Sequence, residues 1–403
     1  MSELPNFNSP EFQRDLYANY AKIREATPVH VNMFNGSPRY SILRYADVAA
    51  GLRDERLRTS NIDTMTVEKL LASGNEALIN LVNMQRGFLV LQDPPAHTRL
   101  RGLVKRAFTL RAVEALRPRI ESLAHELLDE LERHGEGDLI QLFAIPLPVI
   151  VIAELLGVPP EDRALLKRWS DQLAPILDRT LQSTALVGAM TGAHEFTQYF
   201  RPLAAARRRE PRDDLISAMV AARDEEDALD DEEIVAISMF LLAAGHETTS
   251  NLIGNGVHAL LEYPEQWERL CAAPACFDSA VEEVLRFQSP VQRTVRVTKE
   301  PIEIGGREVP ENVIVDFVLA AANRDPAQFD EPDHFDISRS DNRHLSFSAG
   351  RHFCLGAHLT RLEGQIALRA LSERFPTLKA SESVACYRPG NLLRGLEKLS
   401  VVV

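Results

Sequence analysis

The 403-residue sequence has few cysteines and no long uninterrupted apolar stretch. Four cysteines cannot form a disulfide framework in a chain of this length, which excludes the small disulfide-rich class of secreted protein. The strongest apolar run, residues 139–153, contains Gln141, Pro146 and Pro148 and is shorter than the roughly 20 residues of a membrane-spanning helix, so we predict a buried core helix there. Residues 1–5 show no basic or apolar leader pattern, and we expect a reduced, cytoplasmic protein.

Positive charge is also scarce. The 45 lysines and arginines are outnumbered by 58 acidic residues, and the net charge is −13. General nucleic-acid binding requires a basic surface, so this composition argues against that class of function. With 45% apolar and 26% charged residues the chain can bury a large core, and no repeat or Gly/Ser-rich linker divides it. We predict a single domain over residues 1–403.

Helical periodicity dominates the middle of the chain and strand patterns lie toward its ends. A long helix is predicted from the acidic residues 230–233, which suit the positive end of the helix dipole, to Leu261. Apolar residues also recur three or four apart along one helix face. These are Leu116, Ile120, Leu123, Leu127 and Leu131. Strand patterns cover residues 29–31, 40–42, 295–297, 302–304 and 313–318. The fold class is therefore mainly α with a small β lobe.

One cysteine has an unusual setting. Cys354 lies in the segment Phe-Ser-Ala-Gly-Arg-His-Phe-Cys-Leu-Gly, between Gly350 and Gly356, which permit positive φ and the close approach of a flat group. We expect its thiol in the first turn of a helix, where the dipole favours the thiolate. His344, His352, Cys354 and His358 offer a zinc alternative, but the spacing lacks paired ligands. A single thiolate on a glycine-flanked loop favours an axial haem ligand.

Residues 347–356 resemble the haem-binding signature Phe-x-x-Gly-x-x-x-Cys-x-Gly of the cytochrome P-450 family at all four fixed positions. Ser348 stands where the family usually has glycine, and we expect it to tighten the loop slightly. Residues 244–249, Ala-Gly-His-Glu-Thr-Thr, resemble the family's distal-helix oxygen-activation motif, and residues 283–286 match its Glu-x-x-Arg pair. The resemblance extends over essentially the whole chain. A zinc-protease motif at His246-Glu247 is excluded because the second histidine would be Ser250.

The resemblance implies haem b, held between the long distal helix and the helix that follows the cysteine loop. Cys354 is the implied metal ligand, and small residues at Ala244 and Gly245 let the distal helix cross the cofactor. A glycine in mid-helix costs about 1 kcal/mol relative to alanine and so needs such a reason. The other implied cofactor-binding residues are His97, Arg101, Arg296 and His352, as propionate partners, and Phe347, Gly350 and Gly356 of the loop.

Glu247 and Thr248 are the implied catalytic residues. The Thr248 hydroxyl either bonds back to the carbonyl of Ala244, as mid-helix threonines do, or takes part in proton delivery with Glu247, as the family implies. Glu283 and Arg286 are predicted to form a buried structural ion pair. The family often adds an arginine from a Pro-x-Arg-Phe segment, but here that segment contains His334, so the sequence does not identify the third partner.

The implied reaction inserts one atom of O2 into an apolar small molecule by hydroxylation or epoxidation, the candidates being terpenoids, steroids, fatty acids and polyketides. Substrate contacts are expected from Met84, Phe88, Leu89, Phe240, Ala244, Val291, Gln292, Leu392 and Leu393. The enzyme is expected to be a monomer that receives electrons from a separate ferredoxin and its reductase. The ferredoxin is expected to dock on a basic patch formed by Arg101, Lys105, Arg106, Arg343, Arg351 and Arg361. A peroxide-driven peroxygenase and a non-catalytic haem-binding protein are the alternatives.

Overall fold

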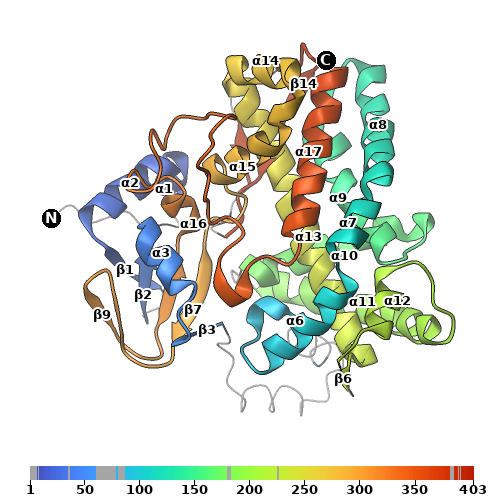
Figure 1. Cartoon of the computed structure of the whole chain (residues 1–403), viewed down its shortest axis with the longest axis horizontal. Helices are drawn as coiled ribbons and strands as arrows, with labels where there is room; N and C mark the ends of the chain where they lie inside the picture. Colours follow the sequence, from blue (N-terminus) through green and yellow to red (C-terminus); the bar gives the residue numbers. More distant parts are fainter. Residues whose placement is uncertain are drawn as a thin grey trace. The chain divides into compact units, whose positions relative to one another are not determined.

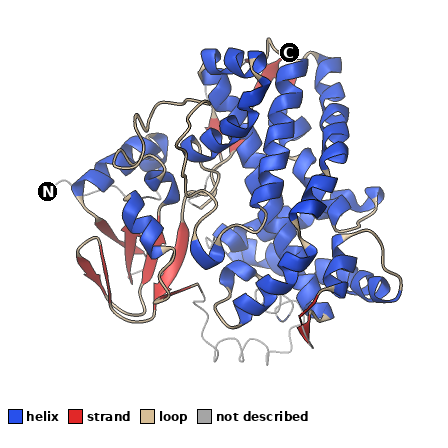
Figure 2. Cartoon of the chain, viewed as in Figure 1, coloured by secondary structure: helices blue, strands red, loops and turns tan. Residues whose placement is uncertain are grey.

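The structure is a computed structural model of the whole chain (Figure 1). The chain divides into two compact units. The described residues are 7, 9–34, 37–59, 79, 87–178, 183–224, 227–381, 385–388, 390 and 392–403. Unit 1 comprises Met1–Thr59, Ala124–Ala144 and Thr248–Val403, and unit 2 comprises Ser60–Leu123 and Ile145–Glu247. Helices predominate, and the strands form small sheets (Figure 2). This composition confirms a mainly α fold with a small β component.

The largest sheet lies in unit 1 and has five strands in the order β1-β2-β10-β7-β3. The strands are β1 (Val29–Phe34), β2 (Ser37–Ile42), β3 (Leu57–Arg58), β7 (Thr294–Thr298) and β10 (Ile314–Phe317). β1 and β2 form an antiparallel hairpin, β10 runs parallel to β2, and β7 runs antiparallel to β10. Val29, Ile42, Val315 and Phe317 bury their side chains in the adjoining core. The predicted strands in both regions are confirmed, while residues 35 and 36 between β1 and β2 lie outside the described part.

Unit 1 also contains seven α-helices among its described residues. They are α1 (Pro10–Arg14), α2 (Leu16–Ala26), α3 (Tyr45–Gly51), α14 (Pro264–Ala272), α15 (Phe277–Phe287), α16 (Leu319–Ala322) and α17 (Ala357–Arg374). The remaining strands are β4 (Glu136–Asp138), β8 (Ile302–Ile304), β9 (Arg307–Val309), β11 (Lys379–Ala380), β12 (Cys386–Tyr387), β13 (Leu396–Lys398) and β14 (Ser400–Val402). Gly305 and Gly306 form the β8–β9 turn at φ values of 57° and 77°, a conformation that glycine adopts without steric cost.

In its described residues, unit 2 is helical apart from one short hairpin. Its helices are α6 (Ala96–Ala107), α7 (Leu110–Ala115), α9 (Pro146–Leu155), α10 (Arg163–Asp178), α11 (Ser183–Arg209) and α12 (Leu215–Ala221). The hairpin joins β5 (Arg223–Asp224) to β6 (Asp227–Ala228). Arg99 of α6 binds Asp227 of this hairpin at 2.8 Å and also pairs with Glu233, which fixes three segments of the unit to one another.

Two helices contribute residues to both units, α8 (Arg117–His134) and α13 (Asp231–Glu262). α13 is the long helix that the sequence predicts. It begins with a reciprocal cap, because Glu233 N donates to Asp230 Oδ1 at 2.7 Å and Asp230 N donates to Glu233 Oε2 at 3.0 Å. On α8 the predicted apolar face is largely correct, although Leu128 is fully buried and Leu127 only partly.

The apolar run at residues 139–153 is buried as predicted but is not one helix. A π-helical turn, Ile140–Ala144, is followed by α9, which starts at Pro146. Proline has no backbone N–H to continue the preceding ladder and is well suited to the first position of a new helix. Within the described part of the chain, no helix is long and apolar enough to span a membrane.

Candidate active site

The cysteine loop is a tight reversal of the chain in unit 1. The Cys354 amide donates to the Phe347 carbonyl at 2.9 Å, and Ser348 N donates to Leu345 O at 2.7 Å. Gly350 has a φ of 68°, and a Cβ there would lie 2.9 Å from the Leu52 carbonyl oxygen, so only glycine fits. Ser348 also has a positive φ, 61°. Serine therefore holds a left-handed conformation that disfavours residues with a Cβ, which explains why glycine is usual at this position.

Cys354 is half-buried and lies outside the helix that follows it. α17 starts at Ala357 with Gly356 as its N-cap, so the prediction of a thiol in the first helical turn is wrong. The short 3₁₀ turn Gly350–His352 and the two residues after it delay the start of the helix. The sulfur thus depends less on the helix dipole than the sequence suggested, since that effect falls off beyond the first turn.

A cation from α17 compensates for this. Arg361 binds Glu282 of α15 through two hydrogen bonds of 2.7 and 2.8 Å, and its guanidinium lies 4.6 Å from the centre of the Phe347 ring. The hydrogen bond to Glu282 raises the pKa of Arg361, and the negative Cys354 sulfur adds a smaller effect in the same direction. Burial opposes ionisation of Glu282, but hydrogen bonds from Arg361 and His344 outweigh burial and lower its pKa to about 2. A permanently charged ion pair therefore supports the loop.

The zinc alternative finds no support in this geometry. His344 Nε2 lies 3.2 Å from Glu282, and in the described ranges no group of three or more His, Cys, Asp or Glu side chains is arranged to hold a metal. A thiolate on a glycine-flanked loop fits an axial haem ligand. Gly245 is consistent with this, because a Cβ there would make only an ordinary 3.5 Å contact with Ile152. Packing within the protein thus does not require a glycine at this position.

The implied propionate partners come from different elements. His97 of α6 is 2% exposed and Arg101, one turn later, is half-buried. Arg296 of β7 is 3% exposed, and its Nη1 donates to Thr294 Oγ1 at 2.9 Å and to the Val295 carbonyl at 2.8 Å. His352 is half-buried in the 3₁₀ turn of the cysteine loop. Within unit 1, Arg296 and His352 are thus presented by a sheet strand and the ligand loop, and within unit 2, His97 and Arg101 share one helix face.

The expected catalytic pair lies in the middle of α13. Ala244, Gly245, Glu247 and Thr248 are all half-buried and helical. The adjacent Thr249 is buried, and its hydroxyl lies 3.5 Å from that of Thr360 in α17. The helix therefore presents the acid and the alcohol on consecutive residues, and Thr249 faces α17.

Several expected substrate contacts are brought together from distant parts of the sequence. In unit 2 the rings of Phe88 and Phe240 lie 5.2 Å apart between centroids, and Leu89 follows in a short 3₁₀ helix, Leu89–Leu91. In unit 1 Val291 forms a β-bridge with Leu393, and Gln292 N donates to the Leu392 carbonyl at 2.7 Å. Gln292 is 2% exposed, which leaves it little contact with solvent. Met84 lies outside the described residues.

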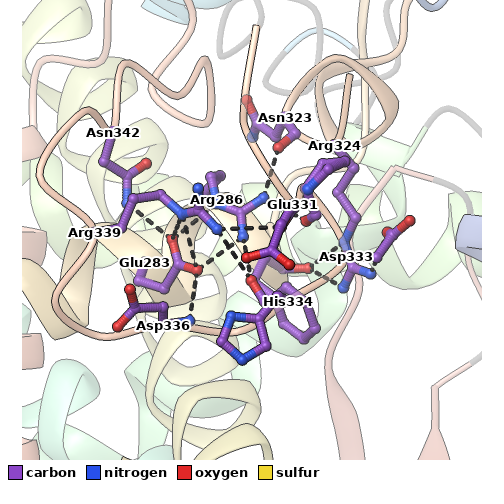
Figure 3. Close-up of polar contacts among 12 residues, drawn as sticks. Glu283, Arg286, Asn323, Arg324, Glu331, Asp333, His334, Asp336, Arg339 and Asn342 are labelled. Carbon is purple, nitrogen blue, oxygen red and sulfur yellow. Dashed lines mark hydrogen bonds and ion pairs between the residues drawn. The ribbon is translucent and has the colours of Figure 1, made fainter. Parts of the chain in front are cut away.

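The Glu283–Arg286 pair is completely buried, with both side chains 0% exposed (Figure 3). Arg286 Nε and Nη2 each donate to Glu283 at 2.8 Å, and its remaining donors reach the carbonyls of Asn323, Pro332 and His334. Arg339 completes the pair, with Nε 3.3 Å from Glu283 Oε2. His334 contributes its backbone carbonyl, so the third cation comes from five residues beyond the position where the family often has it.

Asn342 Nδ2 and the Asp336 amide also donate to Glu283, both at 3.0 Å. The dashed lines in Figure 3 show these donors converging on one carboxylate. The sequence does not identify Arg339, Asn342 or Glu282 as members of these networks. No local pattern marks them, since each lies tens of residues from its partner and follows no helical or strand spacing.

The residues of the expected docking patch differ in the partners that they bind. Arg343 pairs with Asp341 at 2.9 Å, and Arg361 is engaged with Glu282. Arg351 Nη2 donates to the Asp54 carbonyl at 3.5 Å. On α6, Lys105 and Arg106 are exposed. Arg361 therefore contacts both Glu282 and the Phe347 ring of the cysteine loop from α17.

Comparison with known proteins agrees with this geometry. The sequence model of the Cytochrome P450 family matches residues 175–272 and 276–391. Cytochrome P450 107B1 of Saccharopolyspora erythraea is 42% identical over 97% of this chain and 95% of its own length. Vitamin D(3) 25-hydroxylase of Pseudonocardia autotrophica is 40% identical over 98% of this chain and 95% of its own.

A solved structure, P450BioI in complex with acyl carrier protein ligated with hexadec-9Z-enoic acid, has a TM-score of 0.90 and 38% identity, and covers 97% of this chain and 98% of that one. The chain belongs to the cytochrome P450 family. It is a haem-dependent monooxygenase that uses O2 and an apolar small-molecule substrate, and proteins of this family bind haem b through a cysteine thiolate.

Proposed function

We propose that Cys354 is the thiolate ligand of haem b in this monooxygenase, and that Glu247 and Thr248 deliver the protons that the reaction consumes. The observation that carries the proposal is the geometry of the cysteine loop. The Cys354 amide is hydrogen-bonded to the Phe347 carbonyl, and Gly350 has a conformation and a close backbone contact that only glycine allows. His97, Arg101, Arg296 and His352 would hold the two propionates. Phe347, Gly350 and Gly356 would shape the loop, and Ala244 and Gly245 would let α13 approach the cofactor.

When bound, haem would supply the activation of O2 and the transfer of one of its oxygen atoms to a C–H or C=C bond, the other atom leaving as water with the two electrons from the donor and two protons. The chain's own residues hold the thiolate and move protons. Arg361 keeps a positive charge near the Cys354 sulfur, while Thr248 orients a proton donor and Glu247 relays protons to it. Acid–base assistance of this kind contributes roughly 10²–10⁴-fold to a rate.

The substrate is proposed to be an apolar molecule of moderate size, of the terpenoid, steroid, fatty acid or polyketide type. Phe88 and Phe240 in unit 2, and Val291, Gln292, Leu392 and Leu393 in unit 1, supply an apolar lining with one amide. The names of the relatives, a vitamin D(3) hydroxylase and a P450 held with a fatty-acyl carrier protein, support this range. Leu89, Ala244 and Met84 complete the proposed set of contacts.

A separate ferredoxin and reductase are proposed as electron donors to a monomeric, cytoplasmic enzyme. Lys105 and Arg106 are exposed on α6 of unit 2, which suits a basic docking surface. The four cysteines are all free, as in a reducing compartment. Reduction by a ferredoxin should slow as ionic strength rises, because surface charges are screened over about 10 Å at 0.1 M salt.

The test begins with the reduced protein and carbon monoxide, for which a red-shifted Soret band marks a thiolate ligand. Cys354→Ser should abolish that band, whereas Cys271→Ser, which changes a cysteine remote in the sequence, should keep it. A screen of compounds for the iron spin shift then identifies the substrate class. Purified protein with stoichiometric zinc and no haem would disprove the proposal.

Thr248→Ala tests the proton-delivery role. Substrate binding and the spin shift should be retained, but product formed per reductant consumed should fall, with hydrogen peroxide released instead. If the threonine hydroxyl only bonds to the Ala244 carbonyl, the variant should couple electrons to product as well as the wild type does. That result would remove Thr248 from the catalytic set and leave the haem assignment intact.

A further inference from the structure

A buried hydrogen bond joins α10 to α13 next to the proposed proton-delivery pair. Ser170 Oγ and His246 Nδ1 lie 2.8 Å apart, and the two residues are 1% and 5% exposed. Both belong to unit 2. His246 directly precedes Glu247 and Thr248, yet neither it nor Ser170 has a part in holding the haem or the substrate as proposed above.

On the α10 side, two consecutive residues face different helices. The Trp169 ring packs at 5.5 Å from Phe196 and 6.4 Å from Phe200 of α11, and its Nε1 donates to Glu195 at 2.9 Å. Side chains of adjacent helical residues point about 100° apart. Trp169 therefore fixes α10 to α11, while Ser170 reaches across to α13.

On the α13 side, the turn before Glu247 lies close to two helices. A Cβ added at Gly245 would lie 3.5 Å from Ile152 of α9, and His246 is hydrogen-bonded to Ser170 of α10. The residues before them, Ala243 and Ala244, are too small to make extensive side-chain contacts. Because the turn has so few large side chains, the hydrogen bond from His246 is a strong constraint on its rotation.

We propose that His246 is a positioning residue, which through its hydrogen bond to Ser170 fixes the rotation of the α13 turn that carries Glu247 and Thr248. The contact also couples that turn to the α10–α11 pair, so that a displacement of α10 displaces the proton-delivery residues. This role deepens the proposed monooxygenase function and rests on it for its catalytic consequence. The hydrogen bond is buried. Removing one partner therefore leaves the other without a hydrogen bond, at the cost of its desolvation free energy.

Amide hydrogen exchange of the haem-loaded protein tests the positioning directly and requires no substrate. Ser170→Ala should speed exchange of the amides of residues 245–248 about fivefold, the effect expected for one lost hydrogen bond. His246→Asn should act similarly. The double variant should exchange these amides only slightly faster than either single variant, since both substitutions remove the same hydrogen bond. Ser170→Thr, which keeps the hydroxyl, should restore wild-type exchange.

Ser238→Ala is the matched control. Ser238 is also a fully buried serine, and on α13 itself, but its hydroxyl donates to the Ile234 carbonyl at 2.8 Å within the same helix. This variant should leave exchange at residues 245–248 unchanged. Equal effects of Ser238→Ala and Ser170→Ala, or additive effects of the Ser170 and His246 changes, would overturn the proposal.

Turnover supplies the second readout. With hexadec-9Z-enoic acid as the probe and a surrogate ferredoxin and reductase, Ser170→Ala should release about three to ten times more peroxide per reductant than the wild type, at unchanged affinity for the probe. Ser170→Thr should return to wild type. If amide exchange at residues 245–248 changes but the peroxide released per reductant does not, His246 has no effect on proton delivery and the catalytic part of the proposal is wrong. A wild-type protein without a thiolate Soret band would refute the proposed function instead, and the exchange result would still stand.

Discussion

Glu283 on α15 and Glu363 on α17 are both almost completely buried, 0% and 2% exposed, on helices that pack against each other in unit 1. Glu283 receives hydrogen bonds from Arg286, Asn342 and the Asp336 amide and lies beside Arg339. Glu363 Oε1 has no hydrogen-bond partner among the described residues, and burial raises the pKa of its carboxyl to about 8.

These two acids show the two ways in which a protein interior accommodates a carboxyl group. A carboxylate loses its hydration on burial and must recover the energy from cations and donors, or it must keep its proton. Glu283 follows the first route and becomes the centre of a network, whereas Glu363 follows the second and remains a neutral, isolated group. Residue type and burial are the same, so the neighbours alone make the difference.

The largest effect is expected from Arg286→Ala. The change leaves Glu283 with Arg339 as its remaining cation and frees three backbone carbonyls, and breaking a buried pair typically costs about 3–5 kcal/mol. We expect poorly folded protein with little haem, measured by the urea midpoint and by haem content after purification. Arg374→Ala is a suitable control, since Arg374 pairs with Asp129 at the surface and should cost far less. Normal stability and haem content of Arg286→Ala would show that the network is dispensable.

The next largest effect is expected in the pH dependence of the free energy of unfolding, to which Glu363 contributes. In the folded protein the Glu363 carboxyl keeps its proton up to a pH of about 8. In the unfolded chain it releases that proton near its ordinary pKa of 4.5. The free energy of unfolding should therefore fall as pH rises from 4.5 to 8, by about 1.4 kcal/mol for each pH unit from this group.

Glu363→Gln replaces the neutral acid with a neutral amide and should remove that slope. The variant should be more stable than wild type at pH 8 and closest to it near pH 5, in urea titrations at a series of pH values. If both proteins lose stability in parallel, Glu363 is ionised or solvated in the folded state, and its contrast with Glu283 disappears.

A smaller effect separates the members of the Glu283 network. Arg339→Ala removes the third cation together with its bonds to the Asp330, Glu331 and His334 carbonyls, and should cost roughly 1–3 kcal/mol. His334→Ala should be nearly neutral, because His334 contributes only its backbone carbonyl to Arg286. Unfolding midpoints of the two variants decide the point, and a larger loss for His334→Ala would contradict the assignment.

The smallest effect is expected at the cysteine loop. Ser348→Gly should stabilise the protein by about 1 kcal/mol, because glycine adopts the φ of 61° without the penalty that a Cβ incurs. It also removes a buried hydroxyl that has no hydrogen-bond partner in the described structure. Thermal unfolding of the haem-loaded variant measures the gain, and a lower midpoint would show that the hydroxyl is needed.

Features carried by neighbouring residues could be predicted from the sequence. The β1–β2 hairpin, the extent of α13 and the pairing of Glu283 with Arg286 follow from spacing that is intrinsic to strands and helices. The loop around Cys354 was equally visible, because its glycines and its thiol lie within ten residues. Predictions failed where a local break intervened, as at Pro146 and between Cys354 and α17.

Features that depend on residues far apart in the chain were accessible only from the folded chain. Arg361, which was expected at a docking surface, binds Glu282. The third charged group beside the Glu283–Arg286 pair is Arg339. No sequence pattern distinguishes Glu363 from a surface glutamate, or links Ser170 to His246. The chain's local spacings therefore establish its family, its cofactor loop and its helices. The charge state and hydrogen bonding of buried groups arise from long-range packing, since desolvation and partners depend on which elements meet in space.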